Sequence, residues 1–212
     1  MTREDLPEPE TPESVSFGSM NETTTANIVS EIEDKRDETT KHFRMDDGTI
    51  MAVNYGSPVH YKNSKGKWIE YNNSLIADDD TLSAATADEA VCGFVNKKSD
   101  IDIKVAPDSR SEKMIHIGAK KGDISWKYSG AKLSNAKVKN NNKKYKGNEK
   151  FTNVDKMTST AKYENIYENV DLECIVSPTG VKENLILGNK DAQNEFEIVY
   201  DIKGLTAKQI ND

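Results

Sequence analysis

The sequence has few of the residues on which most catalytic and metal sites depend. It contains two cysteines, three histidines and two tryptophans in 212 residues. Cys92 and Cys174 belong to no Cys-x-x-Cys motif and to no Cys/His cluster, so a zinc site has no support. The sequence leaves a disulfide between them open, although two half-buried thiols are the simpler expectation. We therefore expect no bound metal.

Long apolar segments are also missing. No run of about eighteen apolar residues occurs, so the sequence predicts no membrane span. Residues 1–14, "MTREDLPEPETPES", lack the basic start and apolar stretch of a signal peptide. Taken literally, the chain carries no export signal of its own.

Charge is distributed unevenly along the chain. Residues 1–40 carry eleven acids and three bases, a net charge of −8, whereas the remainder carries 25 acids and 26 bases, a net charge of +1. A neutral body gives no electrostatic reason to expect a nucleic-acid partner. Residues 1–38 are predicted to be a disordered acidic linker, because they contain too little apolar surface to offset the entropy of ordering. Within them, Ile28, Val29 and Ile32 have the spacing of one short amphipathic helix, and continued linker is the equal alternative.

From residue 39 onward the pattern becomes that of β-strands. Asp46-Asp47-Gly48 separates two apolar stretches, which predicts a hairpin, and residues 58–75, "PVHYKNSKGKWIEYNNSL", predict a second one. Short strand-like stretches bounded by Gly, Pro, Asn or Asp recur at 90–96, 101–107, 114–130, 171–187 and 195–205. Many short strands with frequent turns predict an all-β, antiparallel β-sandwich, jelly-roll-like and built of hairpins, over residues 39–212. A turn of helix is expected only within residues 78–90.

A lysine-rich stretch interrupts the strands. Residues 131–150 contain seven lysines and one acid. A basic patch for an anionic polymer is one interpretation, but Asn140-Asn141-Asn142 at its centre favours a solvated hairpin tip.

Signals for catalysis are weak or absent. His42, His60 and His116 stand near no nucleophile signature, and the last two alternate with apolar neighbours, which predicts outward-facing strand side chains. The 36 acids make any carboxylate pair uninformative, and no calcium loop or glycine-rich phosphate loop is present. We expect no enzyme activity, no catalytic residue and no cofactor.

The aromatic residues provide the remaining candidates for a site. Trp68, with Tyr61 and His60 nearby, and Trp126 could contact a ligand, the two indoles serving as platforms for sugar rings. The same residues could instead anchor the core, which the scarcity of aromatic residues favours.

Two stretches resemble one family. Residues 41–75, "KHFRMDDGTIMAVNYGSPVHYKNSKGKWIEYNNSL", are similar to the opening of large, exported, wall-associated proteins of Gram-positive bacteria that carry DNRLRE domains and RHS (YD) repeats. The matching residues there are His60, Tyr61, Gly66 and Trp68. Residues 163–187, "YENIYENVDLECIVSPTGVKENLIL", match at Tyr163, Tyr167, Asp171, Leu172, Gly180, Lys182 and Glu183. Asn169 stands where the family usually has glycine. Cys174 replaces a common aromatic residue, so we expect it in the core.

The resemblance covers roughly residues 35–212 and implies a non-catalytic, structural or interaction module. It implies an extracellular, cell-wall location; the signal peptide would lie upstream of this chain, or the gene would be truncated. Its partners would be downstream domains of the parent polypeptide and cell-wall polysaccharide. Members of the family continue past "GLTAKQIND", so we expect a β unit truncated at its C-terminus, with an exposed edge. The alternatives are a carbohydrate-binding β-sandwich and, with less support, a hydrolase fragment.

The resemblance also suggests local roles. His60 and Trp68 would lie across a hairpin and serve cross-strand packing. Lys182 and Glu183 would form a charge pair after a turn in which Gly180 has a positive φ.

Overall fold

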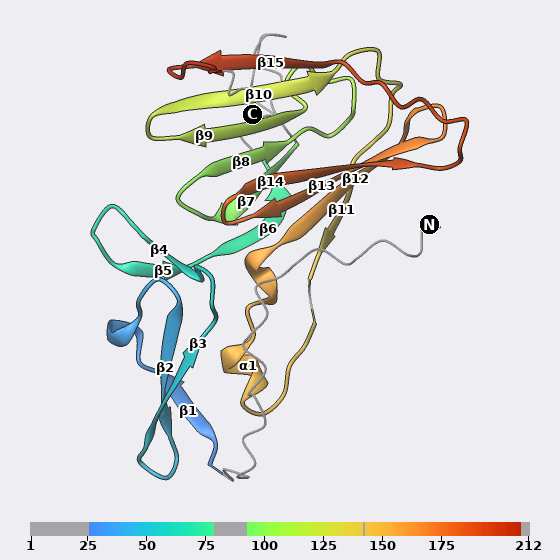
Figure 1. Cartoon of the computed structure of the whole chain (residues 1–212). Helices are drawn as coiled ribbons and strands as arrows, with labels where there is room; N and C mark the ends of the chain where they lie inside the picture. Colours follow the sequence, from blue (N-terminus) through green and yellow to red (C-terminus); the bar gives the residue numbers. More distant parts are fainter. Residues whose placement is uncertain (1–25, 79–92, 142, 209–212) are drawn as a thin grey trace.

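The computed structural model describes residues 26–78, 93–141 and 143–208. These residues form fifteen strands, one four-residue α-helix and two short 3₁₀ turns. Every strand pairing is antiparallel, and Figure 1 shows a large two-layered part above a small one. The predicted all-β, sandwich-like fold is confirmed. Most of the predicted acidic linker, the predicted helical turn within 78–90 and Cys92 lie outside the described residues.

The small part, here called the small body, contains a three-stranded sheet and a hairpin. Its strands are β1 (Ile28–Glu31), β2 (Thr40–Met45), β3 (Ile50–Asn54), β4 (His60–Lys62) and β5 (Trp68–Glu70). The predicted turn between β2 and β3 is confirmed: Gly48 has a φ of +84°, and the Thr49 amide and hydroxyl both donate to Asp47 Oδ1. The β4–β5 hairpin is the second that the sequence predicted.

The short helix expected near residues 28–32 is wrong. Residues 28–31 form β1, which pairs with β2 so that Ile28 lies opposite Met45, and a 3₁₀ turn, η2 (Glu33–Lys35), follows. Ile28 is buried in the core of the small body while Val29 is 56% exposed, so the stretch alternates as a strand does. Pairing with β2 overrides a weak local periodicity. Because β1 belongs to the same sheet as β2, the folded part begins before residue 39.

The large part, here called the sandwich, consists of two sheets. The six-stranded sheet has the order β15-β10-β9-β8-β7-β6, and the four-stranded sheet has the order β11-β12-β13-β14. The strands are β6 (Asn72–Ala77), β7 (Phe94–Lys98), β8 (Asp102–Val105), β9 (Ile115–Ala119), β10 (Gly122–Tyr128), β11 (Lys137–Asn140), β12 (Ser159–Tyr167), β13 (Val170–Ser177), β14 (Gly180–Leu187) and β15 (Ile198–Lys203).

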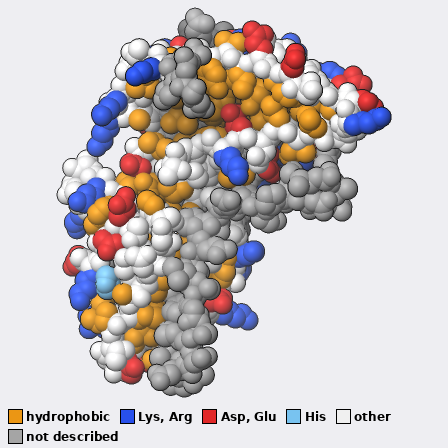
Figure 2. All heavy atoms as spheres, viewed as in Figure 1, with side chains coloured by type: hydrophobic (Ala, Val, Ile, Leu, Met, Phe, Trp, Pro, Cys, Tyr) orange, Lys and Arg blue, Asp and Glu red, His pale blue; other side chains and the backbone are white. Residues whose placement is uncertain are grey.

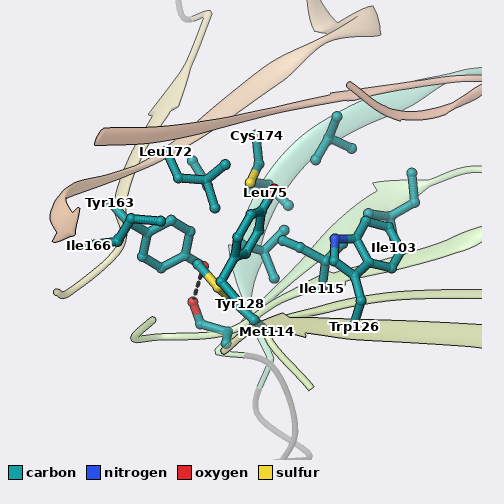
Figure 3. Close-up of a cluster of buried hydrophobic side chains, with 14 of the residues drawn as sticks. Leu75, Ile103, Met114, Ile115, Trp126, Tyr128, Tyr163, Ile166, Leu172 and Cys174 are labelled. Atoms are coloured by element: carbon teal, nitrogen blue, oxygen red, sulfur yellow. Dashed lines mark hydrogen bonds between the residues drawn. The ribbon is translucent and has the colours of Figure 1, made fainter. Parts of the chain in front are cut away.

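The core of the sandwich lies between these sheets. Figure 3 shows Ile115 and Trp126 of one sheet pointing toward Leu172 and Cys174 of the other. All four side chains are buried, and Cys174 is a free thiol with no exposed surface, as its predicted core position requires. Burial raises the pKa of this thiol well above its ordinary value, which keeps it protonated and unreactive.

A long connection between β11 and β12 joins the two parts. This connection, residues 141–158 and here called the strap, carries α1 (Glu149–Thr152) and η5 (Asp155–Met157). Met157 is buried in the core of the small body, and the hydroxyl of Tyr55 donates to the Thr152 carbonyl at 2.7 Å. The strap therefore anchors the small body to the sandwich.

The solvated tip expected around Asn140 lies further along the chain, at Lys143, Lys144, Lys146 and Gly147, which are exposed. Asn140 ends β11, and its side-chain amide accepts from the Leu75 amide at 2.9 Å and donates to the Leu75 carbonyl at 2.8 Å. Leu75 lies in β6, so this asparagine links the two sheets. Among residues 26–78, 93–141 and 143–208, no helix has the length and apolar character that a membrane span requires.

Candidate functional site

Three of the four predicted contact residues lie on the β4–β5 hairpin, and the fourth lies in the sandwich. In the hairpin His60 lies opposite Glu70, and Lys62 lies opposite Trp68. His60 and Trp68 are therefore on opposite strands, as predicted, but neither is the direct partner of the other. Trp126 belongs to β10 and to a separate core, so the two tryptophans do not form one surface.

His60 is buried, with 1% of its surface exposed, so the prediction that it faces outward is wrong. The alternation fails because the amides of Val59 and His60 both donate to the Glu38 carbonyl, at 2.8 and 3.1 Å, which bends the chain just where β4 begins. His60 Nδ1 lies 2.6 Å from the Asp37 carbonyl oxygen and must carry the proton to donate to it. Burial lowers the pKa of His60, which favours the neutral imidazole.

The aromatic residues of the hairpin are engaged with their neighbours. The Lys62 ammonium lies 4.8 Å from the centre of the half-buried Trp68 ring and occupies one of its faces. Tyr61 packs on Tyr71 with their ring centres 5.0 Å apart, and the Tyr71 hydroxyl donates to Asp100 at 2.9 Å. These contacts suit packing better than a flat platform for a sugar.

Trp126 is a core residue, which is the role that the scarcity of aromatic residues in the sequence favoured. Only 6% of its surface is exposed, and its indole nitrogen donates to both carboxylate oxygens of Glu183, at 2.9 and 3.0 Å. The predicted positive φ of Gly180 is confirmed at +137°. Glu183 pairs with Trp126 rather than with Lys182, because neighbouring residues in a strand point to opposite faces.

The structure reveals a charged cluster in the small body that sequence reasoning missed. Lys41 is 1% exposed, and its ammonium lies 2.6 Å from Glu70. Beside it, Arg36 forms two hydrogen bonds with Glu31, at 2.6 and 2.8 Å. Burial alone would raise the pKa of Glu31, but the Arg36 hydrogen bond and the charges of Lys41 and Arg36 outweigh burial and lower that pKa. One signal was available: Lys41 shares the inward alternation of Phe43 in β2.

A pocket of about 350 Å³ opens between this cluster and the strap. Its lining combines three acids, four lysines, two aromatic rings and an amide: Glu31, Lys41, Glu70, Lys143, Tyr145, Lys150, Phe151, Asn153, Asp155 and Lys156. Among the described residues that line it there is no histidine, cysteine, serine or threonine. In the described residues, no group of three His, Cys, Asp or Glu side chains is arranged to hold a metal ion. Such a lining suits the binding of a polar molecule.

Comparison with known proteins adds no relative. No protein-family model, no curated protein and no solved structure matches this chain. The resemblance to wall-associated proteins therefore remains a prediction.

Proposed function

We propose that this chain is a non-catalytic structural and interaction module of a large, exported, cell-wall-associated bacterial protein of the DNRLRE/RHS type. One observation supports it above the others: several residues that carry the resemblance are buried or have a special backbone conformation, and they hold the fold together. Such roles are those expected of an architectural module.

The two tyrosines of the second matching stretch tie the sheets together. The hydroxyl of Tyr163 in β12 donates to the Ala106 carbonyl at 2.6 Å, just after β8. The hydroxyl of Tyr167 donates to the Ser129 carbonyl, also at 2.6 Å, just after β10. Each bond links the four-stranded sheet to the six-stranded one, so both tyrosines have structural roles.

Asp171 organises the turn between β12 and β13. It is fully buried, accepts a hydrogen bond from the Asn165 amide at 2.9 Å and lies 3.3 Å from the Lys162 ammonium. Asn165 and Asn169 have positive φ values of 51° and 57°. The second explains the departure from the family pattern, because asparagine is the residue that best replaces glycine in the left-handed region.

The proposed location can be tested in cells of the organism that encodes the chain. Antibodies raised against the purified chain should label intact cells, and enzymatic digestion of the wall should release the labelled protein. Labelling that requires lysis of the cells would contradict the proposal. The proposed partners, downstream domains of the parent polypeptide, would be released in the same covalent fragment.

Saccharide binding is a second candidate function, favoured by the pocket beside the strap. Tyr145 and Phe151 provide aromatic surface there, and Asn153 provides an amide, which together suit a polyhydroxylated ligand. Calorimetric titration of wall polysaccharide into the chain and into the variants Tyr145→Ala and Trp68→Phe tests this function. Loss of binding in Tyr145→Ala alone would place the ligand in the pocket, loss in Trp68→Phe alone would place it on the hairpin, and no heat from any glycan would exclude this function.

A further inference from the structure

The free edge of β15 carries an unusual amount of exposed apolar surface. β15 is the outermost strand of the six-stranded sheet, and Val199, Tyr200 and Ile202 are 43%, 52% and 37% exposed. Figure 2 shows hydrophobic side chains gathered across the sandwich in the band between β15 and β14. An unprotected edge strand with apolar side chains is a ready template for pairing with another strand.

The backbone of β15 is set up to accept such a strand. The Ser129 amide donates to the Glu197 carbonyl at 2.9 Å, which fixes the alternation of hydrogen bonds between β10 and β15. In an antiparallel pair every second residue points its amide and carbonyl toward the neighbouring strand. The polar backbone groups of Val199 and Asp201 therefore face β10, and those of Ile198, Tyr200 and Ile202 face the open edge. In the described part of the chain, no backbone group pairs with these three donors and three acceptors.

We propose that a second copy of this chain pairs with that edge, antiparallel, about a two-fold axis that passes through Tyr200. This register sets Tyr200 opposite Tyr200 of the second copy and Ile198 opposite Ile202 of the second copy. At its ends it sets Glu197 opposite Lys203 of the second copy. Apolar residues meet at Tyr200/Tyr200 and Ile198/Ile202, and opposite charges meet at Glu197/Lys203, which are favourable cross-strand pairs, whereas Val199 lies opposite Asp201. The inference concerns self-association and goes beyond the proposed function.

Three other two-fold registers of the same edge are less favourable. An axis through Asp201 sets two carboxylates directly opposite each other, and an axis through Val199 sets Glu197 opposite Asp201. Like charges in these positions destabilise a sheet. An axis through Ile202 requires pairing at Gly204, which has a φ of +71° and follows the last residue of β15.

The side chains on the inner face of β15 would lose the most solvent exposure in this dimer. Tyr200 lies opposite Trp126 in the register of β10 and β15, and their ring centres are 5.9 Å apart. Tyr200 and Ile202 thus lie on the core side of the sheet, yet both remain substantially exposed. Tyr200 and Ile198 of the second copy would cover them and continue the sheet from one sandwich into the next.

Sedimentation of the purified chain over a range of concentrations tests the proposal. We expect a reversible monomer–dimer equilibrium, whose dissociation constant rises at least about tenfold in Tyr200→Lys. Val29→Lys is the matched control, since Val29 is equally exposed but lies on β1, and it should leave dimerisation unchanged. A chain that stays monomeric at every concentration would overturn the proposal and leave the edge to a strand of a different polypeptide.

Cross-linking tests the register without reliance on the stability of one variant. In a Cys92→Ser background, oxidation of Tyr200→Cys should give a covalent dimer, because Cα atoms of a hydrogen-bonded pair lie about 5.5 Å apart, within the span of a disulfide. Lys203→Cys should not cross-link, because the two copies of residue 203 would lie six residues out of register. Equal cross-linking of both variants, or of neither, would contradict an axis at Tyr200.

Discussion

The indole nitrogen of Trp126 in β10 and the carboxylate of Glu183 in β14 are joined by two hydrogen bonds, at 2.9 and 3.0 Å, across the two sheets. A hydrogen bond from Tyr128 reaches the same carboxylate. Burial raises the pKa of Glu183, and the hydrogen bonds from Trp126 and Tyr128 only partly oppose this effect. A largely buried carboxylate is thus one of the polar links between the two sheets.

Glu183→Ala should destabilise the sandwich by about 1–3 kcal/mol, because it leaves the buried donors of Trp126 and Tyr128 without an acceptor. Urea unfolding followed by tryptophan fluorescence measures the change. Glu183→Gln keeps an acceptor and serves as the control, with a smaller loss expected. Equal stability of the wild type and Glu183→Ala would show that water replaces the carboxylate at no cost.

The contact between Trp126 and Glu183 also predicts that the stability of the fold depends on pH. Because the pKa of Glu183 is raised in the folded state, its protonation stabilises the fold below the unfolded pKa of 4.5, and this contribution disappears as the pH rises through the folded pKa. The stability of the wild type relative to Glu183→Gln should therefore fall as the pH rises from 4.5. A difference that is constant with pH would mean that the carboxylate ionises as freely as in the unfolded chain.

The burial of His60 predicts that stability changes with pH in the opposite direction. Burial lowers its pKa, so the unfolded chain takes up a proton more readily than the folded chain does. The stability due to neutral His60 is present above pH 6.5 and is lost as the pH falls through the folded pKa. We expect the free energy of unfolding to drop between pH 7.5 and pH 5.5, and to drop less in His60→Gln.

His116 is the matched control for this measurement. Burial lowers its pKa as well, but it is only half-buried and lies on β9 in the sandwich. His116→Gln should therefore remove a separate part of the pH dependence. If His60→Gln followed the wild-type curve, protonation of His60 would have no part in the acid sensitivity of the small body.

The stability of the fold should depend more strongly on Glu70 than on Lys41, the two members of one ion pair. Glu70→Ala removes the hydrogen-bonded counter-ion of the Lys41 ammonium, whose side chain is 2% exposed, and leaves only the charge of the nearby Glu31, so it should cost about 3 kcal/mol. Lys41→Met fills the same space without a charge and leaves a carboxylate that is 32% exposed, so its cost should be below about 1 kcal/mol. Chemical denaturation of both variants provides the comparison, and an equal cost for both would contradict the burial of Lys41 as the controlling factor.

Local signals allowed most of the strands to be predicted from the sequence. Turn residues such as Asp46-Asp47-Gly48 and Gly180 specify backbone conformations by themselves, and alternation around them specifies the faces of the strands. The core positions of Trp126 and Cys174 also followed, from the scarcity of aromatic residues and from the family resemblance.

Features that depend on distant parts of the chain could not be predicted in this way. The carboxylate partner of Lys41 is 29 residues away, and that of Trp126 is 57 residues away. No local pattern specifies either pair. β1 resembled a helix over a few residues and became a strand because β2 pairs with it. His60 turned inward because a carbonyl of the preceding loop binds two consecutive amides.

Asn169 provides a test of the link between the family resemblance and the backbone. Its φ of +57° costs an ordinary L-residue about 1–2 kcal/mol, whereas glycine adopts it freely. Asn169→Gly, which introduces the residue usual in the family that the chain resembles, should change the free energy of unfolding by less than about 0.5 kcal/mol, while Asn169→Val should lower it by more than about 1 kcal/mol. Glu168→Val, at the exposed neighbouring position, controls for the cost of a β-branched residue in this turn. If Asn169→Val were no worse than Glu168→Val, the positive φ would not explain why asparagine stands where the family has glycine.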